Sequence, residues 1–345
     1  NAALARVTVE ERARAELEAR ERARLEEEAK DLRRYRSEFF ARMQPVRVVM
    51  EACGSAHHWG RELMKLGHEV RLIPPAYVKP YVMRNKTDAR DAAAICEAGS
   101  RPHMRRVPVK TIEAQADRAL QRTHDLLVRQ RTAAANAIRG HLGEMGIAAP
   151  SGRAGLARLM EMVAAQDAAI PQGLIAPLEA LARQHRALNE EIDALKAAIA
   201  SRVRQDAAMK GLTRIPMVGP MTAHAMVAAI GDGKQFNSAR DFAAWLGLTP
   251  KQASSGEKTL SGKISKQGDE PLRRLFVLGA ATALRRPEKA SPWLKGLIAR
   301  RPAKVAMIAQ AAKTARIAWA VHVSQEDYRS VPKDRADRVA PACRG

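Results

Sequence analysis

The chain has 345 residues, of which 46% are hydrophobic, so it is long enough for about two domains with buried cores. Its formal net charge of +22 attracts polyanions, which makes nucleic acid the first candidate partner. Cys53, Cys96 and Cys343 form no CxxC pair, which argues against a zinc site or disulfide framework and indicates a reducing compartment. With no apolar run of membrane length and no signal-peptide pattern, we expect a bacterial cytoplasmic protein without a membrane partner.

The basic charge is concentrated toward the C-terminal part of the chain. Residues 251–316 hold 15 Lys and Arg but 4 Asp and Glu, a net charge of +11 and half of the total. This stretch predicts a surface that faces phosphate, and the alternative is a solvated basic surface without a ligand. Because 4% of the residues are aromatic, stacking of bases on exposed rings is not expected to be the main binding mode.

The first structured region is predicted to be a small α/β domain. Two strand-like runs, residues 46–50 and 69–73, flank a helical run at residues 56–66. Gly67 ends the helix, and Pro74 ends the second strand. The order is β-α-β, so the economical interpretation is an α/β domain that closes near residue 110.

Two long helices follow, predicted at residues 111–145 and 171–204. The second carries an apolar seam at heptad spacing, which His185 interrupts. The seam residues are Leu178, Leu181, Leu188, Ile192, Leu195 and Ile199. We therefore expect an antiparallel coiled-coil arm, which is more often a packing or dimerisation device than a chemical site.

The fold class is α/β plus α, with short helices separated by Gly and Pro after Gly211. The expected parts are a charged helical segment (1–44), the α/β domain (45–110), the coiled-coil arm (111–205), a mostly helical C-terminal domain (206–324) and a flexible tail (325–345).

Three acidic residues form the first chemical candidate. Glu51 ends the first strand, and Asp88 and Asp91 are three positions apart on one face of a helix start. A carboxylate at the end of a buried strand is costly unless it is paired or binds a metal, and together the three could hold Mg²⁺. The alternative, favoured by spacing alone, is that Asp88 caps the helix and Asp91 is a first-turn acid beside the positive helix end.

The sequence IPMVGPMTA at residues 215–223 is similar to a helix-hairpin-helix turn, in which backbone N–H groups at a helix start bind a DNA phosphate. Gly219 and Thr222 are the candidate contacts. Pro220 stands where that motif usually has its second Gly and removes one donor. A plain turn between two helices is the open alternative.

Residues 246–268 alternate glycines, hydroxyl side chains and lysines between two helices. This composition favours a flexible phosphate-binding loop over a serine that accepts a phosphoryl group, because a serine needs a base or a metal to become a nucleophile. The candidate nucleic-acid-binding residues of this region and the helix after it are Lys251, Lys258, Lys263, Lys266, Arg273 and Arg274.

Three blocks, MEACGSAHHWGRELMKLGHEVRLIPPAYVKPYVMRNKTDARDA, IPMVGP and LGLTPKQASSGEKTLSGKISKQGDEPLRRL, together resemble the DEDD transposase family of insertion sequences, the one-ten type, over about residues 39–321. The resemblance implies an RNase H-like amino-terminal domain, a coiled-coil connection and a transposase-20-like serine domain. It makes Glu51, Asp88 and Asp91 the last three acids of a Mg²⁺-binding tetrad. It makes Ser255 the nucleophile, with Ser254 as the nearest competitor.

The resemblance also implies partners. Members of this family are described as DNA recombinases directed by a structured bridge RNA, in which the metal site and the serine come from different subunits. DNA, a guide RNA and further copies of the chain, joined through the arm, are therefore the expected partners.

The departure from the family pattern lies at the amino end. The family's first acid is an Asp on an amino-terminal strand, whereas residues 8–40 interleave Glu and Arg at helical spacing, and Asp31 stands inside that pattern. The chain is thus expected to be truncated, re-fused or decayed there, with an incomplete RNase H-like sheet. Three functions follow: an active recombinase, a nucleic-acid-binding remnant of one, and a Holliday-junction or repair nuclease, which the serine block disfavours.

Overall fold

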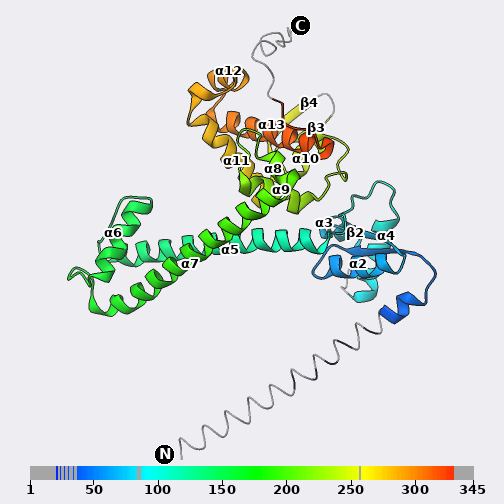
Figure 1. Cartoon of the computed structure of the whole chain (residues 1–345), viewed down its shortest axis with the longest axis horizontal. Helices are drawn as coiled ribbons and strands as arrows, with labels where there is room; N and C mark the ends of the chain where they lie inside the picture. The colour runs from blue at the N-terminus through cyan, green and yellow to red at the C-terminus, as the bar shows by residue number, and fades with distance from the viewer. Residues whose placement is uncertain are drawn as a thin grey trace, which may run out of the picture. The chain divides into compact units, whose positions relative to one another are not determined.

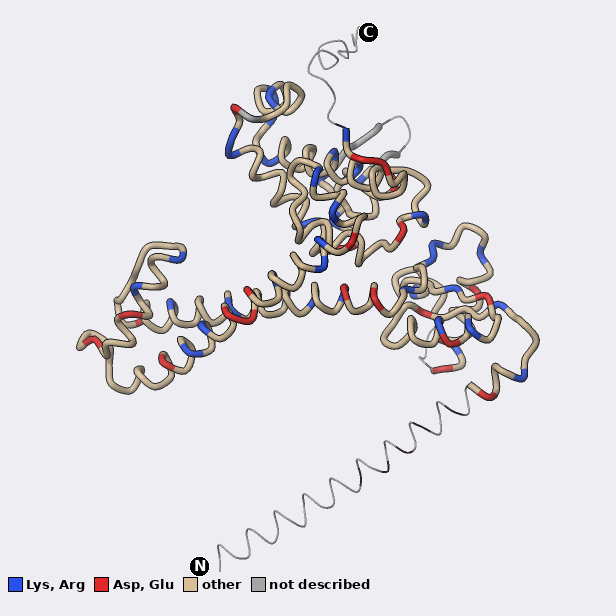
Figure 2. The backbone as a smooth tube through the Cα atoms, in the orientation of Figure 1, with Lys and Arg blue, Asp and Glu red and all other residues tan. Residues whose placement is uncertain are grey.

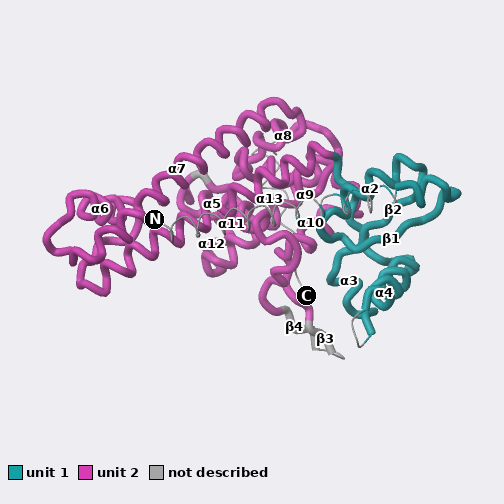
Figure 3. The backbone as a smooth tube through the Cα atoms, turned by 90° about the horizontal axis from the view of Figure 1, so that it is seen from below, with its two compact units in different colours: residues 1–111 teal, residues 112–345 magenta. Residues whose placement is uncertain are grey.

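A computed structural model of the chain describes residues 37–83, 87–255 and 258–329, with five single helical positions between residues 21 and 34, and for residues 253–255, 258–261 and 289 it describes the backbone alone. Asp31, residues 84–86, Gly256, Glu257 and most of the predicted tail lie outside the described residues. The chain divides into two compact units, Asn1–Thr111 and Ile112–Gly345 (Figure 3), which are treated separately below.

The first unit contains the predicted β-α-β order. Strand β1 (Arg47–Glu51) is followed by helix α2 (Ala56–Lys65) and strand β2 (Glu69–Ile73), labelled in Figure 1. The strands pair in parallel, from Arg47 opposite Glu69 to Glu51 opposite Ile73. Gly67 has a φ of +87°, a conformation that L side chains rarely adopt, and it allows the chain to turn from α2 into β2.

Helix α4 (Asp88–Ser100) covers the small parallel sheet, after the short helices α3 (Pro75–Val78) and η1 (Lys79–Tyr81). Ala94 and Ala98 of α4 pack with Ile73 and Val78 in one buried cluster. A Cβ at Gly99 would lie 2.6 Å from Val49 Cγ1, so only glycine allows α4 to approach β1 this closely without a shift. The core of the unit thus holds the C-terminal half of α4 against the sheet.

Two long helices, α5 (Ile112–Glu144) and α7 (Gln172–Gln205), pack along each other in the second unit (Figure 1), at the positions that the sequence predicts. The residues of the predicted seam that are buried are Leu178, Leu188, Ile192 and Ile199, while Leu181 and Leu195 are half-buried. The seam of α7 is therefore covered within one chain.

Helix α6 (Arg153–Ala164), which the sequence analysis did not predict, packs on α5 and α7. Its buried leucines Leu156 and Leu159 join Ile138 and Leu142 of α5 in an apolar cluster. A Cβ at Gly155 would lie 1.9 Å from the carbonyl oxygen of Pro150, so glycine is required where the chain enters α6.

The rest of the second unit is mostly helical and surrounds a core that contains Phe242 and Phe276. Alanines at 311, 315 and 318 let the last helix approach its neighbours closely. The helices are α8 (Ala207–Leu212), α9 (Pro220–Ile230), α10 (Ala239–Trp245), α11 (Glu270–Leu284), η2 (Pro287–Lys289), α12 (Pro292–Arg300) and α13 (Ala303–Ser324). No helix in the described part of the chain has the length and apolar character needed to cross a bilayer.

The prediction of a flexible loop at residues 246–268 is wrong, because most of this segment forms two strands. Strands β3 (Pro250–Ser255) and β4 (Lys258–Ile264) form an antiparallel hairpin, with a register shift between Pro250 and Gln252. The hydrogen bonds between β3 and β4 pair the backbone N–H and C=O groups of both strands, and this pairing does not require an alternating apolar face. Residue composition alone therefore does not reveal such strands.

Candidate catalytic acids, serine hairpin and nucleic-acid interface

The three candidate acids lie on two elements of the first unit, a strand and a helix. Glu51 is the last residue of β1 and is half-buried, while Asp88 and Asp91 belong to the first turn of α4. Thr87, not Asp88, caps α4, and its side chain accepts a hydrogen bond from the N–H of Arg90 at 3.4 Å. Both aspartates are therefore close to the positive end of the helix, which stabilises their negative charge.

The donor type of these acids suits a divalent cation, because Mg²⁺ prefers carboxylate oxygens. Their arrangement does not yet assemble a site: within the described residues, no group of three His, Cys, Asp or Glu side chains is close enough together to hold a metal ion. The carboxylates thus belong to one unit but are not gathered around a common point.

The hairpin of β3 and β4 is fixed at its base by the helical core of the second unit. The N–H of Lys266 donates to the carbonyl of Gly247 at 3.1 Å. A Cβ at Gly268 would lie 1.8 Å from the carbonyl oxygen of Trp245, so only glycine fits at this position. The base of the hairpin is therefore held tightly between α10 and α11.

Arg273 of α11 strengthens this base. Its guanidinium donates to the carbonyls of Leu246 at 3.0 Å and Gln267 at 2.7 Å, and the residue is 9% exposed. This sequence-predicted nucleic-acid contact lies inside the protein, where it satisfies two backbone carbonyls. Both hydrogen bonds are donated by Nη1, so part of the cost of burying the guanidinium is offset by these two carbonyls.

The other predicted basic residues of this region differ in exposure. Lys251, Lys263 and Lys266 are exposed on or beside the hairpin, and Lys258 is opposite Ser255 in the strand register. Arg274 is 46% exposed and donates to Asp125 of α5 at 3.0 Å. The structure thus places Lys251, Lys263 and Lys266 toward the base of the hairpin and Lys258 at its far end, and it gives Arg274 an acidic partner.

Ser255 is the last residue of β3 before the hairpin turn, and Ser254 pairs with Thr259. The serines are therefore at the far end of the hairpin from the clamped base. Strand residues alternate between the two faces of a hairpin, so Ser254 and Ser255 are not interchangeable.

The turn between α8 and α9 is built around Gly219, which caps α9, and Pro220, which is its first residue. Both are exposed, whereas Thr222 is 5% exposed, so the predicted Thr222 contact lies within the helical packing. The carbonyl of Met217 lies against α11, where a Cβ at Gly279 would be 2.2 Å from it. Pro220 has no N–H, so this helix start offers one donor fewer than a glycine would.

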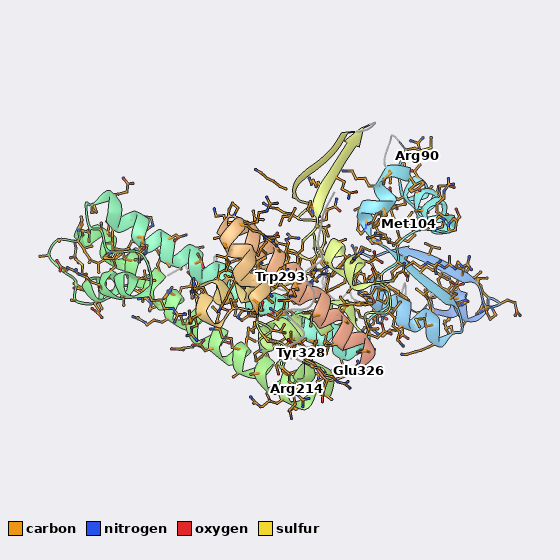
Figure 4. All side chains as sticks on the ribbon, turned by 90° about the horizontal axis from the view of Figure 1, so that it is seen from above. Arg90, Met104, Arg214, Trp293, Glu326 and Tyr328 are labelled. Atoms are coloured by element: carbon orange, nitrogen blue, oxygen red, sulfur yellow. The ribbon has the colours of Figure 1, made fainter. Side chains whose placement is uncertain are left out.

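A groove of about 680 Å³ lies beside this turn and belongs to the basic stretch. Its lining includes Arg285, Arg286 and Lys313, and Figure 2 shows Lys and Arg residues along α11 to α13. The ammonium of Lys313 lies 4.3 Å from the ring centroid of Trp293, which is labelled in Figure 4. Burial, with a contribution from the charge of Arg316, lowers the pKa of Lys313.

A buried polar network connects α5, α7 and α9. Asp117 accepts two hydrogen bonds from Arg202, each 3.1 Å long, and one from Nε2 of His224 at 3.3 Å. His224 is fully buried, and its Nδ1 lies 3.4 Å from Gln121 Oε1. Burial lowers the pKa of His224 and outweighs the opposite effect of the Asp117 charge. Sequence reasoning missed these residues, because 85 positions separate Arg202 from Asp117.

Comparison with known proteins gives two family matches that together span both units. Residues 8–147 match a DEDD transposase model of the IS110 type, described as "Transposase", and residues 209–294 match the model described as "Transposase IS116/IS110/IS902 family". The first match begins at residue 8, whereas the sequence motifs indicated a start near residue 39. The second match includes the whole β3–β4 hairpin.

Relatives with similar sequences cover most of the chain. A probable family 20 transposase of Pseudomonas aeruginosa is 47% identical over 304 residues, 85% of this chain and 88% of the relative. The transposase for insertion sequence element IS1328 of Yersinia enterocolitica is 39% identical, over 83% of this chain and 86% of the relative. The transposase for insertion sequence element IS1111A of Coxiella burnetii is 40% identical, over 82% and 79%.

The α/β unit that carries the acids and the helical unit that carries the serine hairpin thus match the two halves of one class of protein, the transposases of insertion sequences. This chain belongs to the IS110/IS116 family of these transposases. The DEDD domain suggests an RNase H-like amino-terminal fold, and domains of this type typically depend on a divalent metal.

Proposed function

We propose that this transposase cuts and rejoins DNA through a covalent bond between a serine of the β3–β4 hairpin and a DNA phosphate, with Ser255 as the nucleophile. The observation that carries the proposal is the position of Ser255 at the far end of a hairpin whose base is clamped to the core. A rigid base and a projecting end suit a nucleophile that must enter a DNA strand.

The chemistry that we propose balances without a further reagent. The Ser255 oxygen attacks the phosphorus, the bond between phosphorus and one deoxyribose oxygen breaks, and that oxygen leaves as a hydroxyl with the serine's proton. Attack by a strand-end hydroxyl on the phosphoserine reverses these events, so the bond energy is kept for rejoining. Lys258, which is opposite Ser255 in the strand register, would stabilise the negative charge that develops on the phosphate. Lys251, Lys263 and Lys266 near the base would contact more distant phosphates of the same DNA.

A trapped adduct tests the proposal. Labelled DNA that carries the insertion-sequence end, incubated with the full chain and Mg²⁺, is expected to give a protein–DNA band on a denaturing gel. Ser255→Ala should abolish the band but retain DNA binding, because one hydroxyl contributes only about 1 kcal/mol. Ser254→Ala is the matched control. A band that persists in Ser255→Ala and disappears in Ser254→Ala would move the assignment, and binding without any adduct would identify a nucleic-acid-binding remnant.

We also propose that Glu51, Asp88 and Asp91 supply carboxylates to a Mg²⁺ site. Their carboxylate chemistry supports this role, with Glu51 at the end of β1 and both aspartates in the first turn of α4. Since the described residues do not gather around one point, no step of the chemistry above is assigned to the ion. Titration with Mn²⁺, followed by its paramagnetic signal, should show weaker binding in Asp91→Asn. Unchanged Mn²⁺ affinity in all three single variants, Glu51→Gln, Asp88→Asn and Asp91→Asn, would remove the role.

The exposed hairpin lysines and the α8–α9 turn are proposed as a DNA-binding surface. Replacing Lys263 and Lys266 by Gln should lower the slope of log affinity against log salt by up to about 1.8, since each lost phosphate contact contributes ~0.9 on duplex DNA. The control is Lys79→Gln with Lys234→Gln, which removes two exposed lysines outside the basic stretch and outside the α8–α9 turn. Equal slopes for both pairs would exclude the hairpin from the interface.

A structured guide RNA and further copies of this chain are the remaining proposed partners. Since the seam of α7 is already buried against α5, a second copy would have to use another face of the arm. Light scattering of the purified chain, with and without RNA, measures the number of copies. A monomer under both conditions would contradict the proposed oligomer.

A further inference from the structure

A second basic groove lies far from the hairpin in sequence, between α5, α6 and α7. Its volume is about 760 Å³, and none of its lining residues belongs to the basic stretch at residues 251–316. The charged residues that line it are Arg131, Arg139, Arg153, Arg186, Lys196 and Asp193. Five basic side chains thus surround one acidic side chain, and we call this feature the arm groove.

Two arginines of the arm groove are held by neutral partners. Arg139 donates to the carbonyls of Ala149 at 3.2 Å and Gly152 at 2.8 Å. Arg131 donates to the Asn189 side-chain oxygen at 3.2 Å. Hydrogen bonds to neutral groups fix a guanidinium in place without neutralising it. Both side chains are half-buried and therefore already ordered.

The remaining cations lie in more exposed positions of the groove. Lys196 pairs with Asp193 at 2.9 Å, which is the one acid–base pair within the lining. The pKa of Asp193 is lowered by its hydrogen bond with Lys196 and, more weakly, by the charges of Arg131 and Arg153, so a single carboxylate is shared among several cations. Among the residues that the structure describes, neither Arg153 nor Arg186 has a carboxylate within ion-pair distance, and both are exposed. Burial and the charge of Arg131 lower the pKa of His185, so this residue adds no positive charge near neutral pH.

Several fixed cations along one groove repel one another unless an anion lies between them. The anion that matches a row of cations is a chain of phosphates, and guanidinium groups suit phosphate because they can donate two parallel hydrogen bonds. The lining also includes four apolar residues, Ala135, Leu156, Ala157 and Met160. No Phe, Tyr or Trp ring is among the lining residues, so the groove fits a sugar–phosphate backbone better than a stacked base.

We propose that the arm groove binds the sugar–phosphate backbone of a nucleic acid, without reading its sequence. The arm is then a second nucleic-acid contact, separate from the hairpin surface. The proposal does not depend on the role of Ser255, because it concerns binding alone. Phosphate contacts of this kind position a nucleic acid and fix its register, but they carry no base specificity.

Anisotropy of labelled single-stranded RNA, single-stranded DNA and duplex DNA, measured with the full chain over a range of salt, tests the proposal. The groove variant is Arg153→Gln with Arg186→Gln, and both positions are exposed, so folding should be retained. We expect at least one of the three probes to bind about tenfold more weakly, with its salt slope lowered by ~1.4 for single strands or ~1.8 for duplex DNA. The probe that responds identifies the ligand as RNA or DNA.

The matched control is Arg129→Gln with Arg158→Gln, which removes the same charge from exposed positions of α5 and α6 outside the groove. It should change affinity less than about twofold. Asp193→Asn should have the opposite sign and strengthen binding, because it removes the acid of the groove. Equal losses in the groove and control variants would overturn the proposal. So would unchanged nucleic-acid binding accompanied by loss of poly-glutamate binding, which would indicate an acidic peptide partner.

Lys263→Gln with Lys266→Gln distinguishes this proposal from the hairpin surface. If the groove variant weakens binding and the hairpin variant does not, the arm groove stands and the hairpin surface fails. The reverse result overturns the arm groove and leaves the hairpin surface intact.

Discussion

The two ends of the α5–α7 pair are held by different kinds of interaction. At the α6 end, apolar residues such as Ile138, Leu159 and Leu178 form a cluster with almost no exposed surface. At the α9 end, Asp117, Arg202 and His224 form the polar network. Apolar packing is not directional, whereas hydrogen bonds require defined angles. The comparison teaches that α6 is held mainly by burial, while α9 is held in one orientation.

The largest expected effect is at the apolar end. Leu159 of α6 is 1% exposed, and Leu159→Ala should lower the free energy of unfolding by about 3 kcal/mol, because it leaves a cavity between α6 and the long helices. Urea unfolding followed by circular dichroism measures it. Arg158→Ala, an exposed neighbour on the same helix, should change stability by less than about 0.5 kcal/mol. Equal effects of the two substitutions would mean that α6 does not depend on this cluster.

The next effect is at the polar end. Asp117→Asn keeps an acceptor but removes the charge that Arg202 and His224 contact. We expect a loss of about 1.5 kcal/mol, reduced from the value of a fully buried pair because the Arg202 side chain is 34% exposed. Asp193→Asn removes an exposed carboxylate that also pairs with a cation, Lys196, and is the control for stability. A similar loss in both variants would make the network no stronger than a surface pair.

The smallest effect is the pH dependence of the polar end. Since the pKa of His224 is lowered in the folded chain, the unfolded chain binds the proton more readily. The stability that His224 contributes is therefore complete above its unfolded pKa of about 6.5 and is lost as pH falls from there toward the folded pKa. Urea unfolding between about pH 8 and pH 5 should show a shallower decline for His224→Gln than for the parent chain. Identical slopes would exclude His224 as the titrating group.

Local patterns predicted the elements of this fold well. The two strands of the first unit and the long helices α5 and α7 lie within one or two residues of their predicted limits. The β3–β4 hairpin was missed because its Ser, Thr, Gly and Lys residues form no apolar face from which a strand could be read. Helix α6 was missed because a Gly-containing connection was expected where Gly155 allows close packing.

The sequence could predict those features of the candidate site that depend on residue type and short spacing, but not those that depend on tertiary packing. The acids, the serines and the basic stretch are visible in the sequence, but exposure is a property of the folded chain. Arg273 and Thr222 were chosen as contacts for their residue types, and tertiary packing buries both. The polar network was not visible at all, because His224 and Asp117 are 107 positions apart. The arm groove depends in the same way on three helices coming together.

The clamped base of the β3–β4 hairpin has a mechanical consequence. A strand of seven residues such as β4 extends about 20 Å from its base, so a small rotation at Gly268 becomes a much larger displacement at the turn. Gly247 and Gly268 leave no room for added atoms at the base, and Arg273 ties two carbonyls there. The hairpin is therefore fixed at its base and extends away from it. A force that a nucleic acid exerts on its far end is transmitted through the base to α10 and α11.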